Sequence, residues 1–520
     1  MTSPRDPVPD PSGSRPDNLV VVLLDSLNRH LLTAYGGDEF ATPTISAFAE
    51  QSLRFTRHHV GSLPCMPARH DILVGALDFP WRPWGSIEVW EDAITRSLRA
   101  QGVTTMLVSD HPHLFEVGGE NYHTDFNAWA YERGHESDPW RTAEDPSWVG
   151  APTVLPSVRS GRLHAYDRSR TWFRAEEDFP GPRTMVEAAR WIREEAPSHD
   201  RFFLMVDEFD PHEPFDTPVP FASMYDPDWD APIEIWPPYL VDAVGGGYLD
   251  ERTARHIRAN YGSKLTFIDH WFARLLDALA ETGLDGTTGI ILCTDHGHYL
   301  GEHDLFGKPG VPIYREMGHI PLVVRWPGQT PRDIDALTTS VDLHATVADV
   351  FDAEVDHPTH GTSLVPLIDG TADDVRELAL FGYWGREVGI TDGRRRYLRG
   401  CGETNFPLSM WSNRWSTMPI QALPELRLPR PDRRATLETM PGTDVPVIRQ
   451  PFVAGDPLPF WAAGAPPRQT LLFDTDVDPG ELENRASTTD PDERELRVAL
   501  ADELTRIGAP PDLRERLQLV

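Results

Sequence analysis

Short runs of consecutive apolar residues recur through the first two thirds of the chain. An apolar run without polar alternation is typical of a strand that is buried on both faces, as in a parallel sheet. Several of these runs lead directly into Asp, His or the triplet Thr-Asp-His. The runs cover residues 19–24, 104–108, 202–206, 289–293 and 321–324.

Segments with helical character separate these runs. They cover residues 42–53, 92–101, 183–195 and 252–282, the last closed by Gly283. Alternating strands and helices predict an α/β fold, in which ligands bind at the carboxyl ends of the strands. The polar residues at those ends are Asp25, Asp110, His111, Asp295 and His296.

The pattern changes after about residue 375. Short segments at residues 378–383, 395–398 and 471–474 predict a small antiparallel sheet, and residues 490–507 predict a helix. Two stretches rich in Pro and Trp, residues 121–170 and 401–467, are expected to form long loops. We therefore divide the chain into a disordered N-terminal tail (1–17), a large α/β domain (18–375) and a smaller C-terminal subdomain (376–520).

Length, charge and cysteine count narrow the class of protein. A chain of 520 residues exceeds the size at which single cores stop growing, so two domains are expected. Its net charge of -33 argues against nucleic acids and anionic membranes as partners. Three cysteines cannot form a disulfide framework and fit a reducing compartment. We see neither a secretory signal nor an apolar run of membrane length, so we expect a cytoplasmic protein.

Cys65 opens the run Cys-Met-Pro-Ala-Arg, which ends at Arg69. Pro67 suits the first turn of a helix and Gly75 suits its end, so a helix over about residues 66–73 would place Cys65 at its N-terminus. The helix dipole and the free N–H groups there favour an anion, such as a sulfate or phosphate ester. A buried structural cysteine before an ordinary helix is the alternative interpretation.

Further motifs follow this C-x-P-x-R pattern in a recognisable order. They are Asp210-Pro211-His212-Glu213-Pro214, Asp295-His296-Gly297, Gly301-Glu302-His303, Gly307-Lys308 and His360-Gly361-Thr362-Ser363-Leu364. From about residue 18 to residue 369 the chain resembles the type I, formylglycine-dependent sulfatases of the alkaline phosphatase superfamily. The resemblance implies an alkaline phosphatase-like fold: a large, mostly parallel mixed sheet flanked by helices, plus a smaller C-terminal antiparallel sheet with a helix.

The resemblance also implies a chemistry. Cys65 would be oxidised after translation to formylglycine (3-oxoalanine) by a formylglycine-generating enzyme, and the hydrated aldehyde would attack sulfur or phosphorus. One divalent metal ion would polarise the ester and activate the hydrate. Its ligands would be Asp25, Cys65, Asp295 and His296.

Other residues would assist this reaction. Arg69 would stabilise the nucleophile, while His212 and Lys308 would contact the ester and stabilise charge on the leaving oxygen or the transferred group. His113 would deprotonate the remaining hydroxyl of the hydrate, which expels sulfate or phosphate and restores the aldehyde. Lys308 is one of only two lysines in the chain, and we expect the other, Lys264, on the surface of a long helix.

Three positions depart from the usual sulfatase pattern. Ser26 stands where most sulfatases have a second aspartate, and His296 stands where they often have asparagine. If His113 takes the histidine place of the family's Lys-x-His, His111 stands where lysine should be, and its charge would depend on pH. The Asp and Asp-His ligand set resembles that of the phosphonate monoester hydrolases and of some sulfatases. Calcium is usual in sulfatases, whereas an imidazole ligand suits manganese better.

These observations leave three candidate functions. Hydrolysis of a small sulfate ester comes first, hydrolysis of a phosphonate monoester or phosphodiester by the same site comes second, and a non-catalytic ligand-binding relative comes third. The family's fold allows a monomer or a homo-oligomer. Loop tryptophans either line a sugar or aryl pocket or pack against local structure; among them are Trp129, Trp140, Trp148, Trp172 and Trp411.

Overall fold

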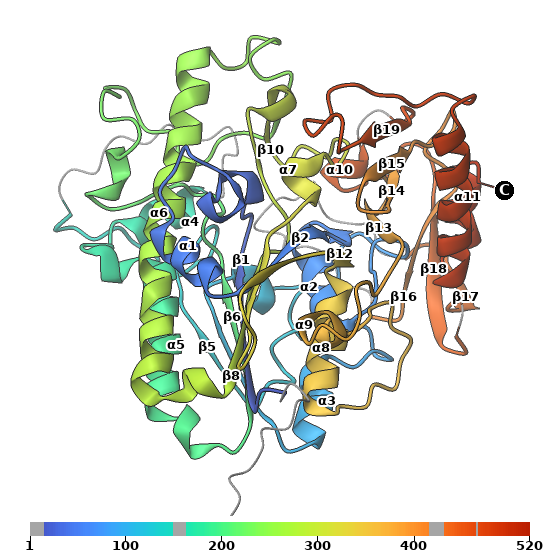
Figure 1. Ribbon diagram of the computed structural model, residues 1–520. Helices are drawn as coiled ribbons and strands as arrows, with labels where there is room; N and C mark the ends of the chain where they lie inside the picture. Colours follow the sequence, from blue (N-terminus) through green and yellow to red (C-terminus); the bar gives the residue numbers. More distant parts are fainter. Residues whose placement is uncertain (1–14, 149–162, 415–430, 442, 464–465, 520) are drawn as a thin grey trace, which may run out of the picture.

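The computed structural model describes residues 15–148, 163–414, 431–441, 443–463 and 466–519 (Figure 1). Most of the tail predicted at residues 1–17 lies outside these ranges. The centre of the molecule is an eight-stranded sheet. Its strands are β1 (Asn18–Leu24), β2 (Leu53–His59), β4 (Thr104–Ser109), β5 (Ala128–Tyr131), β6 (Phe202–Glu208), β8 (Thr288–Cys293), β11 (Leu322–Arg325) and β12 (Arg332–Thr339).

The strand order is β12-β2-β11-β8-β1-β6-β4-β5. Neighbouring strands are parallel, except that β11 is antiparallel to both β2 and β8. In the middle, Val21 of β1 pairs with Met205 of β6 on one side and with Ile291 of β8 on the other. Every residue of β1 is buried, as its unbroken apolar sequence predicts. The predicted α/β class and the five predicted strands of this sheet are therefore confirmed.

Helices cover both faces of this sheet (Figure 1). Because successive strand residues point to opposite faces, β1 contributes Val20 and Val22 to one core and Leu19 and Val21 to the other. The first core also contains residues of α1 (Pro43–Glu50), α5 (Pro180–Glu194) and α6 (Glu251–Thr282). The second contains residues of α2 (Cys65–Val74), α3 (Ile94–Ala100), α8 (Val341–Phe351) and α9 (Val365–Ile368).

A second sheet belongs mainly to the C-terminal part of the chain and has the order β19-β15-β14-β13-β3. Its edge strand β3 (Ser62–Leu63) comes from the segment just before Cys65 and runs parallel to β13. The two parts of the chain therefore share one sheet. The C-terminal elements are β13 (Ala379–Tyr383), β14 (Val388–Thr391), β15 (Arg395–Arg399), β19 (Leu471–Asp474), α11 (Pro491–Arg506) and α12 (Pro511–Arg516).

The prediction of long loops over residues 401–467 is wrong in part. A three-stranded antiparallel sheet lies there, in the order β16 (Leu408–Ser412), β18 (Pro446–Phe452), β17 (Thr436–Thr439). All five residues of β16 are buried, Trp411 among them. Residues 149–162 and 415–430, within the two stretches expected to be loops, lie outside the described ranges. The smaller elements are α4 (Leu163–Arg170), β7 (Leu240–Val241), β9 (Tyr299–Leu300), β10 (Leu305–Gly307), α7 (Arg315–Gly318) and α10 (Phe460–Ala463).

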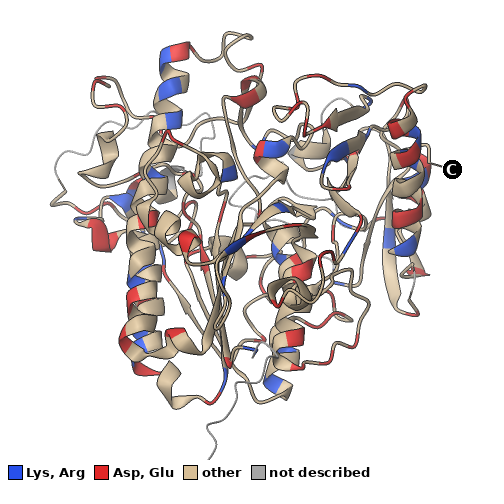
Figure 2. Ribbon diagram, in the orientation of Figure 1, with Lys and Arg blue, Asp and Glu red and all other residues tan. Residues whose placement is uncertain are grey.

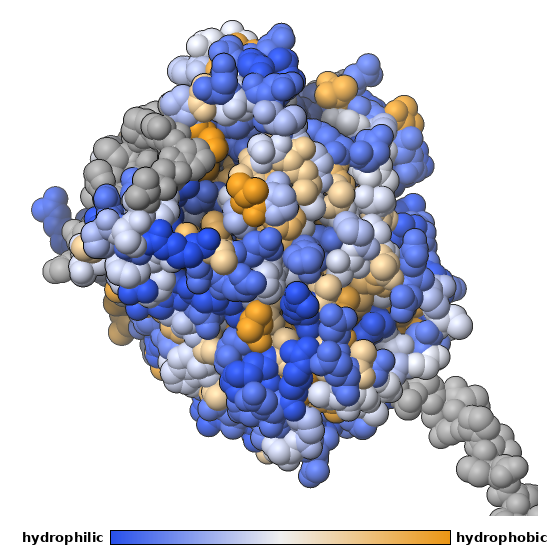
Figure 3. Space-filling view, turned by 90° about the vertical axis from the view of Figure 1, so that its left-hand side faces the viewer, coloured by the Kyte–Doolittle hydropathy of each residue, from blue (hydrophilic) through white to orange (hydrophobic). Residues whose placement is uncertain are grey.

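The acidic surface mixes charges of both signs. Along the outer helices α6 and α11, basic and acidic residues are interspersed (Figure 2). On the face shown in Figure 3, the most hydrophobic residues stand apart among hydrophilic ones. Within the described part of the chain, no helix combines the length and the apolar character needed to cross a membrane.

Candidate active site

Cys65 is the first residue of α2 and is buried, with 5% of its surface exposed. Pro67 lies in the first turn of the helix, and Gly75 ends it with a φ of 77°, as the sequence predicts. Strand β3, which precedes the helix, holds this segment against β13. Cys65 therefore lies inside the protein at the positive end of a helix dipole.

Four of the predicted site residues meet at this helix end. Asp25 follows β1, and Asp295 and His296 follow β8. Because β1 and β8 are adjacent and parallel, their carboxyl ends lie side by side. The possible ligand atoms of Asp25, Cys65, Asp295 and His296 all lie within 4.8 Å of one another, and all four residues are buried. The Nε2 of His296 is 3.3 Å from Cys65 Sγ.

Arg69, one turn after Cys65, is fully buried and contacts three carboxylates. Its Nη2 is 2.9 Å from Asp25 Oδ2, and its Nη1 is 2.9 Å from Asp295 Oδ2. Its Nε and Nη2 donate to the two oxygens of Asp207 at 2.8 and 2.7 Å. The sequence analysis did not place Asp207 in the site, although it ends a buried strand as Asp25 does. The guanidinium therefore fixes three acidic side chains from three strands around Cys65.

Burial shapes the charges of the site. Burial and the nearby Asp295 raise the pKa of Asp25 well above its usual value. Burial alone would also raise the pKa of Asp295, but His296 and Arg69 hold it below its usual value. Burial lowers the pKa of His296 to about 4, so its ring is neutral near pH 7. Two adjacent buried carboxylates beside a neutral imidazole form a setting that a divalent cation would stabilise.

The donor set itself fits such a cation. The Nδ1 of His296 donates to the backbone oxygen of Gly297 at 2.9 Å, which leaves the lone pair of Nε2 available beside Cys65. Two carboxylates, one imidazole and an oxygen at position 65 would make an oxygen-rich mixed site. Such a site suits Mn²⁺ through the imidazole and Ca²⁺ through the carboxylates.

Ser26 stands where the resemblance leads one to expect a second aspartate. Its φ of 62° lies in the left-handed region, where few residues other than Gly, Asn and Asp are found. Its backbone N–H donates to Asp295 Oδ1 at 3.0 Å, and its hydroxyl donates to Asp25 Oδ1 at 2.8 Å. Lys308 Nζ donates to the same hydroxyl at 3.2 Å. Ser26 therefore orients two carboxylates of the cluster.

Lys308 and His111 border the cluster. Lys308 is buried, and its Nζ is 4.0 Å from Cys65 Sγ. His111 Nε2 is 3.6 Å from Asp25 Oδ2, and neither nitrogen of this buried ring has a hydrogen-bond partner among the described residues. Burial, together with Arg69, holds the pKa of His111 well below its usual value. His111 is therefore a neutral ring, at the position that would correspond to the family's lysine if His113 takes the place of the family's histidine.

His113 packs edge-on against His111, with ring centroids 5.3 Å apart. Both of its nitrogens already face carboxylates: Nδ1 is 3.1 Å from Glu116 and Nε2 is 3.3 Å from Glu136. His111 and His113 therefore lie side by side, but only His111 has nitrogens without a hydrogen-bond partner in the described structure.

His212 belongs to the same aromatic group. Phe209 stacks on its ring with centroids 4.1 Å apart and also lies 4.7 Å from the ring of His111. The Nδ1 of His212 donates to the backbone oxygen of Glu213 at 2.6 Å. Burial lowers the pKa of His212 well below its usual value although Glu213 opposes the shift. The structure thus places a second neutral imidazole beside the cluster.

Lys264 is not on the surface, contrary to the expectation from sequence. Its side chain is 2% exposed, and its Nζ is 2.7 Å from Asp210 Oδ1. The same oxygen is 2.7 Å from His135 Nε2. The expectation was wrong because helical periodicity shows which face of α6 is apolar, but not that a buried carboxylate far away in the sequence lies against it.

Comparison with known proteins agrees with this geometry. The family model described as Sulfatase matches residues 17–353. The choline-sulfatase of Rhizobium meliloti (strain 1021) is 25% identical over 413 residues, which cover 73% of this chain and 78% of that protein. The multifunctional alkaline phosphatase superfamily protein PehA of Trinickia caryophylli is 25% identical over 426 residues, which cover 69% of this chain and 78% of that protein.

Two solved structures show the same fold. The phosphonate monoester hydrolase of Agrobacterium radiobacter has a TM-score of 0.63 at 19% identity and covers 97% of this chain and 96% of that chain. The phosphonate monoester hydrolase SpPMH from Silicibacter pomeroyi has a TM-score of 0.62 at 21% identity and covers 95% of this chain and 96% of that chain. Since the family model spans well over half of the sequence, the chain belongs to the sulfatase family of the alkaline phosphatase superfamily.

Proposed function

We propose that this chain hydrolyses sulfate esters with a formylglycine nucleophile made from Cys65 and one divalent metal ion. The observation that carries the proposal is the buried cluster of Asp25, Cys65, Asp295 and His296 at the N-terminus of α2. An unmodified thiol would be a poor nucleophile there, because burial and the nearby Asp25 raise the pKa of Cys65 well above its usual value. Oxidation by a formylglycine-generating enzyme would place an oxygen nucleophile at the same point.

The metal ion, when bound, would polarise the ester and lower the pKa of the nucleophilic oxygen. The chain's own residues supply the remaining functions. Arg69 holds Asp25 and Asp295 so that their oxygens converge on position 65. Lys308, 4.0 Å from Cys65 Sγ, stabilises negative charge on the oxygens of the transferred group or of the leaving alcohol. His212, with its Nδ1 held by Glu213, contacts the ester through its other nitrogen.

We propose His113 as the base that takes the proton of the remaining hydroxyl. Its Nδ1 is 3.1 Å from Glu116 and its Nε2 is 3.3 Å from Glu136, so two carboxylates hold the ring in place. His111 packs against this ring and lies 3.6 Å from Asp25. Because the pKa of His111 is held well below its usual value by burial, His111 is a weak base and suits a positioning role better.

Hydrolysis of phosphonate monoesters or phosphodiesters is the second candidate and uses the same residues. Two observations favour it. His296 takes a place in the cluster where sulfatases often have asparagine, and a neutral His111 stands where they have lysine. In addition, the relative PehA is described as multifunctional.

Mass spectrometry of the tryptic peptide of residues 58–69, from protein made in its native host, is the first experiment. Loss of the sulfur and gain of an aldehyde at Cys65 supports the proposal, and an intact thiol in active protein contradicts it.

The second experiment compares kcat/KM for an aryl sulfate and an aryl phosphonate monoester with the same leaving group. Preference for the sulfate supports the first candidate and preference for the phosphonate the second. No turnover of either by modified, metal-loaded protein contradicts both.

A further inference from the structure

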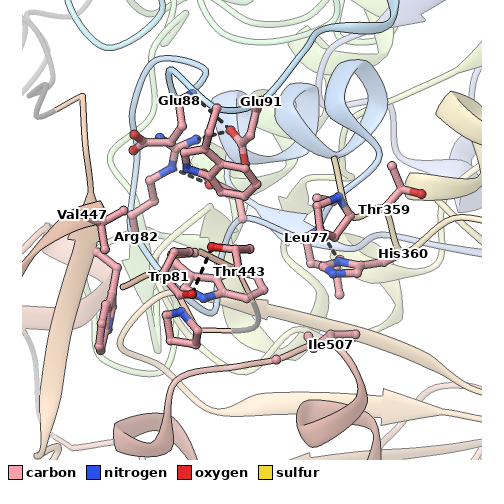
Figure 4. A pocket seen from close by; sticks show the side chains of 18 of the residues that line it. Leu77, Trp81, Arg82, Glu88, Glu91, Thr359, His360, Thr443, Val447 and Ile507 are labelled. Atoms are coloured by element: carbon pink, nitrogen blue, oxygen red, sulfur yellow. Dashed lines mark hydrogen bonds and ion pairs between the residues drawn. The ribbon is translucent and has the colours of Figure 1, made fainter. Parts of the chain in front are cut away.

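A cavity of about 290 Å³ lies at the far end of α2 from Cys65 (Figure 4). It begins at Ala76, just after Gly75 ends the helix. A ten-residue helix is about 15 Å long, so this cavity does not adjoin the catalytic cluster. The side chains that assist Lys308 and His212, the two residues that we place against the ester, therefore lie elsewhere.

Tyr239 lies beside the backbone that leads to Lys308. It comes directly before β7, whose Leu240 pairs with Phe306 of β10. Because the two strands are antiparallel, Tyr239 is opposite Gly307. Gly307 has a φ of 74°, and a Cβ atom added to it would be 2.1 Å from Cδ1 of Tyr239, so the ring packs directly on the Gly307 backbone. The centre of the same ring is 5.9 Å from Lys308 Nζ.

The hydroxyl of Tyr239 donates to Oε1 of Glu213, whose side chain is buried. The other carboxylate oxygen, Oε2, is 3.4 Å from Nδ1 of His212 and 3.9 Å from Nδ1 of His298. Burial would raise the pKa of Glu213, but His212 and Lys308 hold it well below its usual value, so the carboxylate is ionised. Glu213 therefore links the hydroxyl of Tyr239 to the ring of His212.

Lys308 and His212 differ in how they approach position 65. Lys308 Nζ is 4.0 Å from Cys65 Sγ and so lies beside the attacking atom. Among the described residues, no hydrogen bond or ion pair joins His212 to the catalytic cluster, and its ring reaches the site through Phe209, which also packs against His111. In an in-line displacement the leaving oxygen departs on the side opposite the attacking atom. Lys308 therefore suits the transferred group, and His212 suits the leaving oxygen.

We propose that Glu213 and Tyr239 are positioning residues that hold His212 at the leaving oxygen of the ester, an inference that rests on the function proposed above. Tyr239 packs next to Lys308 at one end and donates to Glu213 at the other, so it fixes the separation between Lys308 and His212. This separation affects the rate because a misplacement of about 1 Å can cost a factor of about a hundred.

The charge of Glu213 adds a second effect on His212. A ring that serves a leaving oxygen needs a proton on Nε2, but burial lowers the pKa of His212 and favours the neutral ring. Glu213 opposes burial and favours the protonated ring, as an anionic ester does when it is bound. When the bond to the leaving oxygen breaks, that oxygen keeps the electron pair and takes the Nε2 proton, and the ring regains a proton from water.

The dependence of kcat/KM on the leaving group tests the proposal. Phenyl and 4-nitrophenyl esters are compared, in whichever class, sulfate or phosphonate, the wild type hydrolyses faster. Glu213→Gln keeps the shape of the side chain and removes its charge, and Tyr239→Phe keeps the ring and removes the hydroxyl. We expect each variant to lower kcat/KM for the phenyl ester about tenfold or more, and for the 4-nitrophenyl ester much less, because nitrophenolate is a stable anion that needs little help to leave.

Tyr225→Phe is the matched control. Tyr225 is half-buried like Tyr239, and its hydroxyl is bonded to Thr266 and to the backbone N–H of Ala41. This variant should keep the wild-type ratio of the two kcat/KM values. Thermal melting shows whether each variant retains its fold, and Tyr239→Phe carries the test if Glu213→Gln unfolds.

A second readout does not need turnover. In protein labelled with ¹³Cε1-histidine, the signal of His212 is identified by its loss in His212→Gln. Both Glu213→Gln and Tyr239→Phe are expected to shift this signal, whereas Tyr225→Phe should leave it in place. The shift in Tyr239→Phe is the informative one, because the hydroxyl of Tyr239 contacts Glu213 rather than His212.

Three results would overturn the proposal. Equal losses of kcat/KM for both esters, or no loss in either variant, would show that the pair does not act on the leaving oxygen. An unchanged His212 signal in Tyr239→Phe would show that Tyr239 does not position this ring. A wild type that hydrolyses neither ester contradicts the proposed function instead, and the His212 signal then still decides whether Tyr239 positions the ring.

Discussion

Arg69 joins three acidic side chains inside the protein, and its loss would leave them without their shared cation. We expect Arg69→Met to lower the free energy of unfolding by about 3–5 kcal/mol, because the remaining buried charges become unpaired. Arg69→Lys should retain part of that stability but bind metal more weakly, since an ammonium group cannot make the two-pronged pair with Asp207. Urea unfolding and metal content after dialysis measure the two effects. Wild-type stability of Arg69→Met would contradict this account.

Cys65 can be tested against another buried cysteine of the same chain. We expect Cys65→Ala to reduce turnover to background while the melting temperature stays near that of the wild type, because the change removes only the sulfur at the end of a helix. Cys401→Ala is the matched control, since Cys401 is also buried but lies in the C-terminal subdomain. Turnover by Cys65→Ala within tenfold of the control would refute a nucleophile derived from this residue.

A buried ion pair between His70 of α2 and Glu91, which follows the helix in the chain, makes stability depend on pH. His70 Nε2 is 2.8 Å from Glu91 Oε2. Burial would lower the pKa of His70, but Glu91 and Asp78 outweigh it and raise the value from 6.5 to about 9. A raised pKa means that this stabilisation is complete below about pH 6.5 and is lost as the pH rises through about 9. The shift corresponds to about 3 kcal/mol at most.

Urea unfolding of wild type and His70→Gln between pH 6 and pH 10 measures this contribution. The wild type should lose stability over that range, and the variant should lose much less. Equal slopes in the two proteins would show that His70 is not charged in the folded state.

At acid pH the same ion pair depends on Glu91. The pKa of Glu91 is lowered to about 2, because His70 and Arg82 outweigh burial. Its contribution is therefore present above about pH 4.5 and is lost as the pH falls through about 2.

The elements differ in how well their sequences predict them. β1, β4, β6 and β8 could be predicted because each is an unbroken apolar run buried on both faces. β2 and β12 were not predicted, because charged residues interrupt their apolar positions. Arg54 pairs with Asp333 at 2.7 Å, and Arg57 with Asp335 at 3.1 Å, at partly exposed positions of these two strands. When one face of a strand is exposed to solvent, its apolar residues alternate with polar ones, and this pattern is harder to recognise in a short segment.

The same reasoning applies to the site. Residues at the ends of predicted parallel strands, such as Asp25 and Asp295, could be expected to meet, because the ends of adjacent strands share one edge. Asp207 lies at a similar strand end, but nothing in the local sequence shows that Arg69 reaches it. The burial of Lys264 could not be predicted either, since its partner Asp210 lies in the distant segment that follows β6. Pairings between distant polar residues depend on packing that local patterns do not contain.

In the whole molecule, the C-terminal part of the chain makes direct contacts with the large domain across the boundary that we predict near residue 375. β3 pairs with β13 across it, and the Glu88 carboxylate accepts hydrogen bonds from the backbone N–H groups of Asn413 and Arg414. We expect a chain truncated after residue 375 to lose cooperative unfolding and all turnover, because β3 is left without its sheet and Cys65 without its support. Circular dichroism melting and activity assays measure both. A truncated chain that melts like the full protein would contradict this view.

The pairing of β3 with β13 also affects the order in which the chain can fold during its synthesis. On the ribosome, Cys65 is made long before Gly382 and Tyr383, the residues that pair with Ser62 and Leu63. Until those later residues emerge, the segment around the thiol has no sheet to join and stays open to other proteins. Once the chain is complete, folding buries Cys65 to 5% exposure. If Cys65 is oxidised as we propose, the modifying enzyme would therefore act during synthesis, before the C-terminal residues complete the sheet.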